Sequence, residues 1–146
     1  MYKRQFHDLS PGLDFETKLF AKPDAPELLR RELAAPNYQC RPIAFGTNTD
    51  PYQPIEARYR ITRACLAVLA EAHHPITITT KSDRVLADLE LLRSMAADGL
   101  AAVAISITSL DPRIARTLEP RAPHPERRLA AVARLADAGI PVHVDR

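Results

Sequence analysis

The sequence predicts an α/β fold in which a parallel sheet carries its helices on its outer face. Short runs of apolar and β-branched residues recur along the chain, and amphipathic segments with helical periodicity lie between them. Parallel strands need crossover connections of this length, and helices usually supply them. A portion of a barrel and an open α/β sheet both satisfy this pattern.

The start of the chain has weaker signals. Residues 15–21 are a possible extended segment. Asp24, with Glu27 three positions later, resembles a capping box and predicts a helix that ends before Pro36.

The first predicted core strand covers residues 42–46, and a helix over 55–72 follows it. Pro75 ends that region, and the alternating, β-branched segment 76–80 predicts the second strand. The predicted apolar stripe of the helix consists of Ile61, Ala64, Cys65, Val68 and Ala72.

Ser82 is a suitable cap for the next helix, over residues 83–98, and Gly99 ends it. Residues 100–107 form the most apolar predicted strand. The predicted buried face of the helix carries Val85, Leu89, Leu92 and Ala96.

Asp111 and the proline after it predict the start of a short helix over 112–118. A longer helix runs from Pro125 to Gly139, and a strand at 140–144 follows. The predicted stripe of the longer helix is Leu129, Val132, Ala133 and Ala136.

Composition narrows the functional classes. With 46% hydrophobic residues among 146, the chain is long enough for one domain with a core. A net charge of +2, from 20 basic and 18 acidic residues, is scattered and gives no support for a nucleic-acid partner. No apolar run approaches the roughly 20 residues of a membrane span, and no signal segment follows the start, so we expect a cytoplasmic protein.

Polar residues follow the predicted strands at their carboxyl ends, where ligands bind in parallel α/β folds. Gly46 allows the chain to turn after the first strand, and Asn48, Thr49 and Asp50 present an amide, a hydroxyl and a carboxylate. Lys81 follows the second strand, and Ser106 lies in the third. Asp50 could hold an amino group, Lys81 a carboxylate or phosphate, and Ser106 a ribose. Together they suit an amino-acid-bearing nucleoside.

Structural roles are the alternative for each of these residues. Asp50 could cap a turn, Lys81 could be a solvated residue at a strand exit, and Ser106 could bond to backbone. Cys40 and Cys65 form no metal-binding pair and fit two reduced thiols. The histidines show no ligand spacing and fit structural or solvated roles: His7, His73, His74, His124 and His143.

Several segments together resemble the radical S-adenosylmethionine (SAM) superfamily, in the branch similar to spore photoproduct lyase. They include PIAFGTNTDPYQPIE at 42–56, ITITTKS at 76–82 and TLEPRAP at 117–123. The resemblance implies a partial (β/α) TIM-like barrel with SAM across the strand ends, as the source of a 5′-deoxyadenosyl radical. It places Asn48, Thr49 and Asp50 at the methionine amino group, Lys81 at the carboxylate and Ser106 at the ribose.

The sequence lacks the family's CxxxCxxC loop, whose three thiolates hold a 4Fe-4S cluster, and its two cysteines cannot replace that loop. We therefore expect residues 9–146 to be an incomplete radical SAM core and residues 1–8 to be an unstructured or non-native start. Two alternatives remain: a cluster-free SAM-binding module, and an ordinary α/β enzyme acting on a phosphorylated small molecule. Against the second, the four glycines form no phosphate-binding loop.

Overall fold

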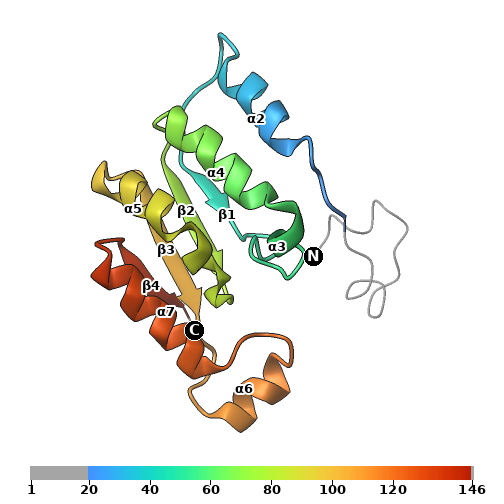
Figure 1. Ribbon diagram of the computed structural model, residues 1–146, viewed down its shortest axis with the longest axis vertical. Helices are drawn as coiled ribbons and strands as arrows, with labels where there is room; N and C mark the ends of the chain where they lie inside the picture. The colour runs from blue at the N-terminus through green and yellow to red at the C-terminus, as the bar shows by residue number, and fades with distance from the viewer. Residues whose placement is uncertain (1–19, 146) are drawn as a thin grey trace.

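The computed structural model of the protein describes residues 20–145. Four strands form a single parallel sheet, and their order in space is their order in the chain (Figure 1). Helical segments connect successive strands, so the predicted α/β class is confirmed, and the arrangement is consistent with part of a TIM-like barrel. The strands are β1 (Ile43–Phe45), β2 (Ile76–Thr80), β3 (Ala101–Ser106) and β4 (Val142–Asp145).

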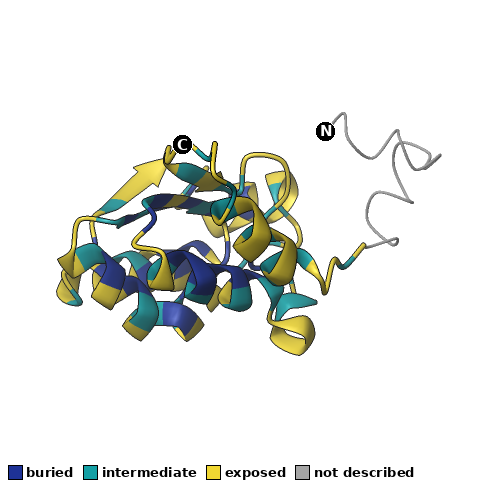
Figure 2. Ribbon diagram, turned by 90° about the horizontal axis from the view of Figure 1, so that it is seen from above, coloured by how far each residue is buried: buried dark blue, intermediate teal, exposed yellow. Residues whose placement is uncertain are grey.

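The helices cover one face of the sheet, as Figure 2 shows. In β3, buried residues alternate with partly exposed ones, because successive side chains of a strand point to opposite faces. Val103 and Ile105 pack in the core, whereas Ala104 and Ser106 lie on the other face. The core also includes Leu66, Leu69, Ile78, Leu92 and Leu135.

The helix predicted over 55–72 is interrupted. α3 (Glu56–Tyr59) ends at Arg60, whose φ of 50° is left-handed, and α4 (Ile61–Glu71) begins immediately after it. The predicted stripe was therefore only partly right, since the buried face centres on Leu66 and Leu69 while Ala72 is exposed. α2 (Ala25–Leu33) packs on α4.

The predicted helix over 83–98 consists of two parts, a 3₁₀ helix η2 (Asp83–Asp88) and α5 (Leu89–Ala97). Ser82 caps the first part by accepting a hydrogen bond from the Arg84 amide, as predicted. The change from 3₁₀ to α geometry falls at Asp88, a buried carboxylate that bonds to side chains outside this segment.

α6 (Pro112–Leu118) is capped by Asp111 as predicted, and α7 (Pro125–Asp137) follows it. The predicted stripe of α7 was right only for Val132, which packs against the core, since Leu129, Ala133 and Ala136 are exposed. The buried residues are Pro125, Arg128, Ala131 and Leu135. Arg128 lies on the packed face of α7. Hydrophobic periodicity does not predict a charged residue on a packed face.

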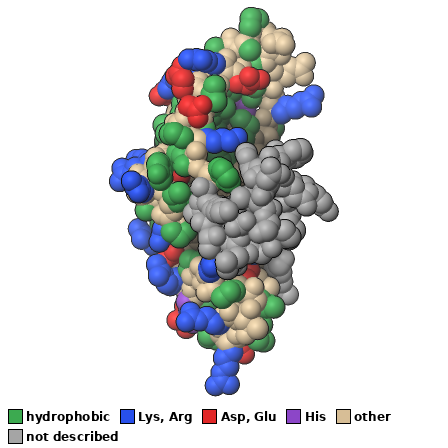
Figure 3. Space-filling view, turned by 90° about the vertical axis from the view of Figure 1, so that its right-hand side faces the viewer, with side chains coloured by type: hydrophobic (Ala, Val, Ile, Leu, Met, Phe, Trp, Pro, Cys, Tyr) green, Lys and Arg blue, Asp and Glu red, His purple; other side chains and the backbone are tan. Residues whose placement is uncertain are grey.

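At the start of α2, the predicted cap is wrong, because the Asp24 side chain makes no capping hydrogen bond. The possible strand at 15–21 lies outside the described residues except for Phe20 and Ala21, which are not in a strand, and residues 1–8 lie outside entirely. Over 20–145, no helix has both the length and the apolar character needed to cross a membrane. Figure 3 shows Lys and Arg side chains scattered over the visible part of one face, with carboxylates among them.

Candidate functional site

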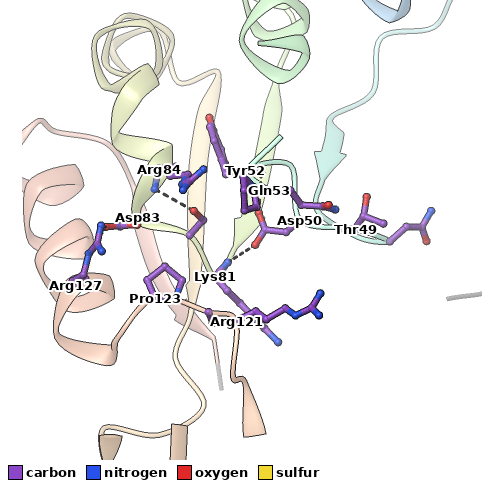
Figure 4. Close-up of a pocket in the computed structure, with 14 residues that line it drawn as sticks. Thr49, Asp50, Tyr52, Gln53, Lys81, Asp83, Arg84, Arg121, Pro123 and Arg127 are labelled. Atoms are coloured by element: carbon purple, nitrogen blue, oxygen red, sulfur yellow. Dashed lines mark hydrogen bonds and ion pairs between the residues drawn. The ribbon is translucent and has the colours of Figure 1, made fainter. Parts of the chain in front are cut away.

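A cleft of about 720 Å³ lies at the carboxyl edge of the sheet. It is bounded by residues 48–54 after β1, by residues 81–84 after β2 and by parts of 121–127 at the start of α7 (Figure 4). Its volume is in the range of small-molecule sites. Four of the five predicted ligand residues line it, namely Asn48, Thr49, Asp50 and Lys81.

Gly46 determines where the first loop runs. Its φ of +93° is a conformation that residues with side chains rarely adopt, and a Cβ at this position would lie 1.9 Å from the Thr79 carbonyl oxygen. Only glycine therefore allows the chain to pass so close to β2. This close approach brings residues 47–50 alongside the end of that strand.

Asp50 joins the loop to β2. Its Oδ1 accepts hydrogen bonds from the Tyr52 amide at 2.8 Å and from the Thr80 hydroxyl at 2.6 Å. Its Oδ2 accepts one from the Lys81 amide at 2.8 Å (Figure 4). The turn-capping role that was the alternative for Asp50 is therefore present. A carboxylate has about four lone-pair positions, so three donors leave one for a ligand amino group, and that role stays a prediction.

A buried carboxylate, that of Asp88, anchors Tyr52, which lines the cleft. Tyr52, which is 2% exposed, donates its hydroxyl to Asp88 Oδ2 at 3.0 Å, and Arg63 Nη1 donates to Asp88 Oδ1 at 2.6 Å. Burial, together with the charge of Asp88, raises the pKa of the Tyr52 hydroxyl well above its ordinary value. Sequence reasoning missed this group, because its members lie on three separate segments and match no local motif.

Lys81 is half-exposed, and its Nζ lies 2.8 Å from Glu119 Oε1. Glu119 also accepts hydrogen bonds from the Thr108 hydroxyl and from Arg128 Nη1, both at 2.7 Å. Burial alone would raise the pKa of Glu119, but the hydrogen bonds from Lys81, Thr108 and Arg128 outweigh it and lower the pKa to about 2. Lys81 is therefore not simply solvated, because its ammonium has a fixed partner.

Ser106 ends β3 at the same sheet edge but does not line the cleft. Its carbonyl oxygen accepts a hydrogen bond from Arg128 Nη1 at 2.7 Å. Its side chain lies on the sheet face opposite Ile105, which packs in the core. The proposed contact of Ser106 with a ribose stays a prediction.

The described residues do not fit an iron–sulfur cluster. Within 20–145, no group of three or more His, Cys, Asp or Glu side chains could hold a metal ion. Cys40 is exposed, and Cys65 lies buried on α4, where burial raises the pKa of its thiol. His74 is buried and contacts the Tyr38 hydroxyl and the Pro75 carbonyl, in agreement with a structural role.

The family model for the radical SAM superfamily matches residues 15–146. The chain belongs to this superfamily. An uncharacterized protein of Mycobacterium tuberculosis and one of Mycobacterium bovis are each 36% identical over 96% of the chain. An uncharacterized protein of Methanocaldococcus jannaschii is 30% identical over 67% of the chain. No solved structure gives a significant match.

The chain spans 41% of the length of the mycobacterial relatives and 36% of the archaeal one. Members of the superfamily generally use SAM and a 4Fe-4S cluster, and membership indicates an enzyme. The cleft has the volume of a small-molecule site, and both carboxylates and cationic side chains are among the residues that line it. The described residues do not supply a site for the 4Fe-4S cluster.

Proposed function

We propose that this chain is the SAM-binding part of a radical SAM enzyme of the spore photoproduct lyase-like branch. When bound, SAM would supply the 5′-deoxyadenosyl radical that abstracts hydrogen from a substrate. A 4Fe-4S cluster needs at least three thiolates at one site, and the sequence contains two cysteines in all. In this proposal the cluster thiolates come from residues outside this sequence.

The main support for the proposal is the position of the Asp50 carboxylate beside the exit of β2. The Asp50 carboxylate bonds to the Thr80 hydroxyl and the Lys81 amide, so the loop after β1 and the exit of β2 form one wall. This arrangement places a carboxylate with a remaining acceptor position and a lysine ammonium on the same cleft. An α-amino acid group carries one cation and one anion, and it needs such a pair.

In the proposed complex, Asp50 accepts a hydrogen bond from the methionine amino group, with Asn48 and Thr49 beside it. Lys81 donates to the methionine carboxylate. Ser106, at the end of the adjacent strand, lies on the ribose side. The assignment to the photoproduct lyase-like branch rests on Lys81 within ITITTKS and on the TLEPRAP string at 117–123.

Titration with SAM tests the proposal. Lys81→Ala should weaken SAM binding roughly 10-fold or more, because a hydrogen bond to a charged group contributes about 1.5 to 3 kcal/mol. Lys22→Ala is the matched control, since Lys22 is exposed and lies outside the residues that line the cleft. Equal SAM affinity of the two variants would show that Lys81 does not contact the ligand.

A further inference from the structure

Lys81 is held in place by one carboxylate. Its side chain extends from the exit of β2 into the cleft, as Figure 4 shows. The ammonium has three N–H donors, and within residues 20–145 the structure records one side-chain partner for it, Glu119 Oε1 at 2.8 Å. Two donors therefore remain for a group inside the cleft.

The Glu119 carboxylate is held in place by hydrogen bonds from two other side chains. Arg128, which is 1% exposed, donates to Glu119 Oε2, and the Thr108 hydroxyl donates to Oε1. Arg128 is in turn fixed by the carbonyl oxygens of Pro123 and Ser106, at 2.9 and 2.7 Å. The carboxylate that Lys81 contacts is therefore anchored to β3 and α7, and it cannot follow the lysine if the lysine moves.

The charges of this group add up to a cation. Lys81 and Arg128 carry one positive charge each and Glu119 carries one negative charge, so the set has a net charge of about +1. Arg128 is buried behind Glu119 and neutralises it at 2.7 Å. A ligand anion that approaches Lys81 therefore meets a group of side chains with a net positive charge.

We infer that Glu119 is a positioning residue that holds the Lys81 ammonium at the cleft, so that a ligand carboxylate meets an oriented cation. The inference deepens the proposed function and rests on it for the identity of the ligand. A free lysine must give up rotamer freedom when it binds an anion, whereas a lysine already held in place loses less. Glu119 then raises ligand affinity without touching the ligand.

The test uses Glu119→Gln with two ligands, SAM and 5′-methylthioadenosine, which lacks the amino acid group. SAM binding should weaken roughly 5- to 30-fold, because the lysine must be ordered anew. Binding of 5′-methylthioadenosine should stay within about 2-fold. In a Lys81→Ala background, Glu119→Gln should have no further effect on SAM affinity. The control Glu90→Gln removes an exposed carboxylate that pairs with Arg93 on α5 and lies outside the residues that line the cleft.

Three results would overturn the inference: unchanged SAM affinity in Glu119→Gln, equal weakening of both ligands, or tighter SAM binding. The last would show that Glu119 competes with the ligand for Lys81. Because Glu119→Gln leaves Arg128 buried without its carboxylate, Thr108→Val serves as a second variant. It loosens Glu119 while the Arg128 pair stays intact, and it should weaken SAM binding roughly 2- to 5-fold.

A ligand-free measurement separates this inference from the proposed function. NMR relaxation of the Lys81 ammonium should show a restricted group in the wild-type protein and a mobile one in Glu119→Gln. If the wild-type protein bound neither nucleoside, the proposed function would fail, and the ammonium measurement would still decide the inference. Equal mobility of the ammonium in the two proteins would refute it.

Discussion

Replacing Arg128 by methionine should destabilise the protein strongly. The guanidinium is 1% exposed and makes three hydrogen bonds, to the carbonyl oxygens of Pro123 and Ser106 and to Glu119 Oε2. Methionine retains much of the apolar volume but donates to none of these acceptors. The change leaves the Glu119 carboxylate without its buried partner.

Removing one partner of a buried ion pair costs about 3 to 5 kcal/mol, because the remaining charge stays desolvated. With a urea dependence of about 2 kcal/mol per molar, the unfolding midpoint should fall by roughly 2 M. Urea unfolding followed by far-UV circular dichroism measures this shift.

Arg134→Met is the matched control, since Arg134 is exposed on the same helix α7. Its effect should stay within about 0.5 kcal/mol. The double variant Glu119→Gln with Arg128→Met should recover part of the lost stability, because the side chain that lost its buried partner is then uncharged as well. A loss below about 1 kcal/mol for Arg128→Met alone would refute the role assigned to this ion pair.

Two further predictions concern Gly46 and Glu119. Gly46→Ala should destabilise the protein by about 2 kcal/mol or more in the same urea assay, because its Cβ would meet the Thr79 carbonyl oxygen. The control is Gly99→Ala, which should cost about 1 kcal/mol, because Gly99 has a φ of +70° but open space around it. The pKa of Glu119 falls from 4.5 to about 2 on folding, so its contribution of about 3 kcal/mol is complete above pH 4.5 and is lost as the pH falls through 2. The difference in unfolding free energy between wild type and Glu119→Gln should therefore shrink over that range, and a constant difference would contradict the assignment.

Local sequence signals were enough to predict two of the three segments that line the cleft, the loop after β1 and the exit of β2. These signals depend only on residues that are close together in the sequence, so they can be recognised without a structure. They are Gly46 after an apolar run, the polar residues after strands and the proline after Asp111. The strand order follows from helical crossovers between short strands. Four of the predicted ligand residues consequently line one cleft.

The parts that sequence reasoning missed depend on contacts between distant segments. Asp88 bonds to Tyr52 and Arg63, and Arg128 bonds to Glu119. No local sequence pattern predicts either group. Arg128 also explains the mostly wrong stripe on α7, because a charged residue was not expected on a packed face. The break at Arg60 was missed because a left-handed arginine leaves no sign in the sequence.

SAM binding at the cleft is tested most directly by a titration of the protein with SAM that is followed by amide chemical shifts. If SAM binds in this cleft, the shifts should saturate together and cluster at the carboxyl edge of the sheet, in residues 46–53 and 81–84, and at Ser106. Residues at the opposite edge, such as His74 and Gly99, should not move. An absence of saturable shifts, or a cluster at the opposite edge, would contradict the claim that this cleft binds SAM.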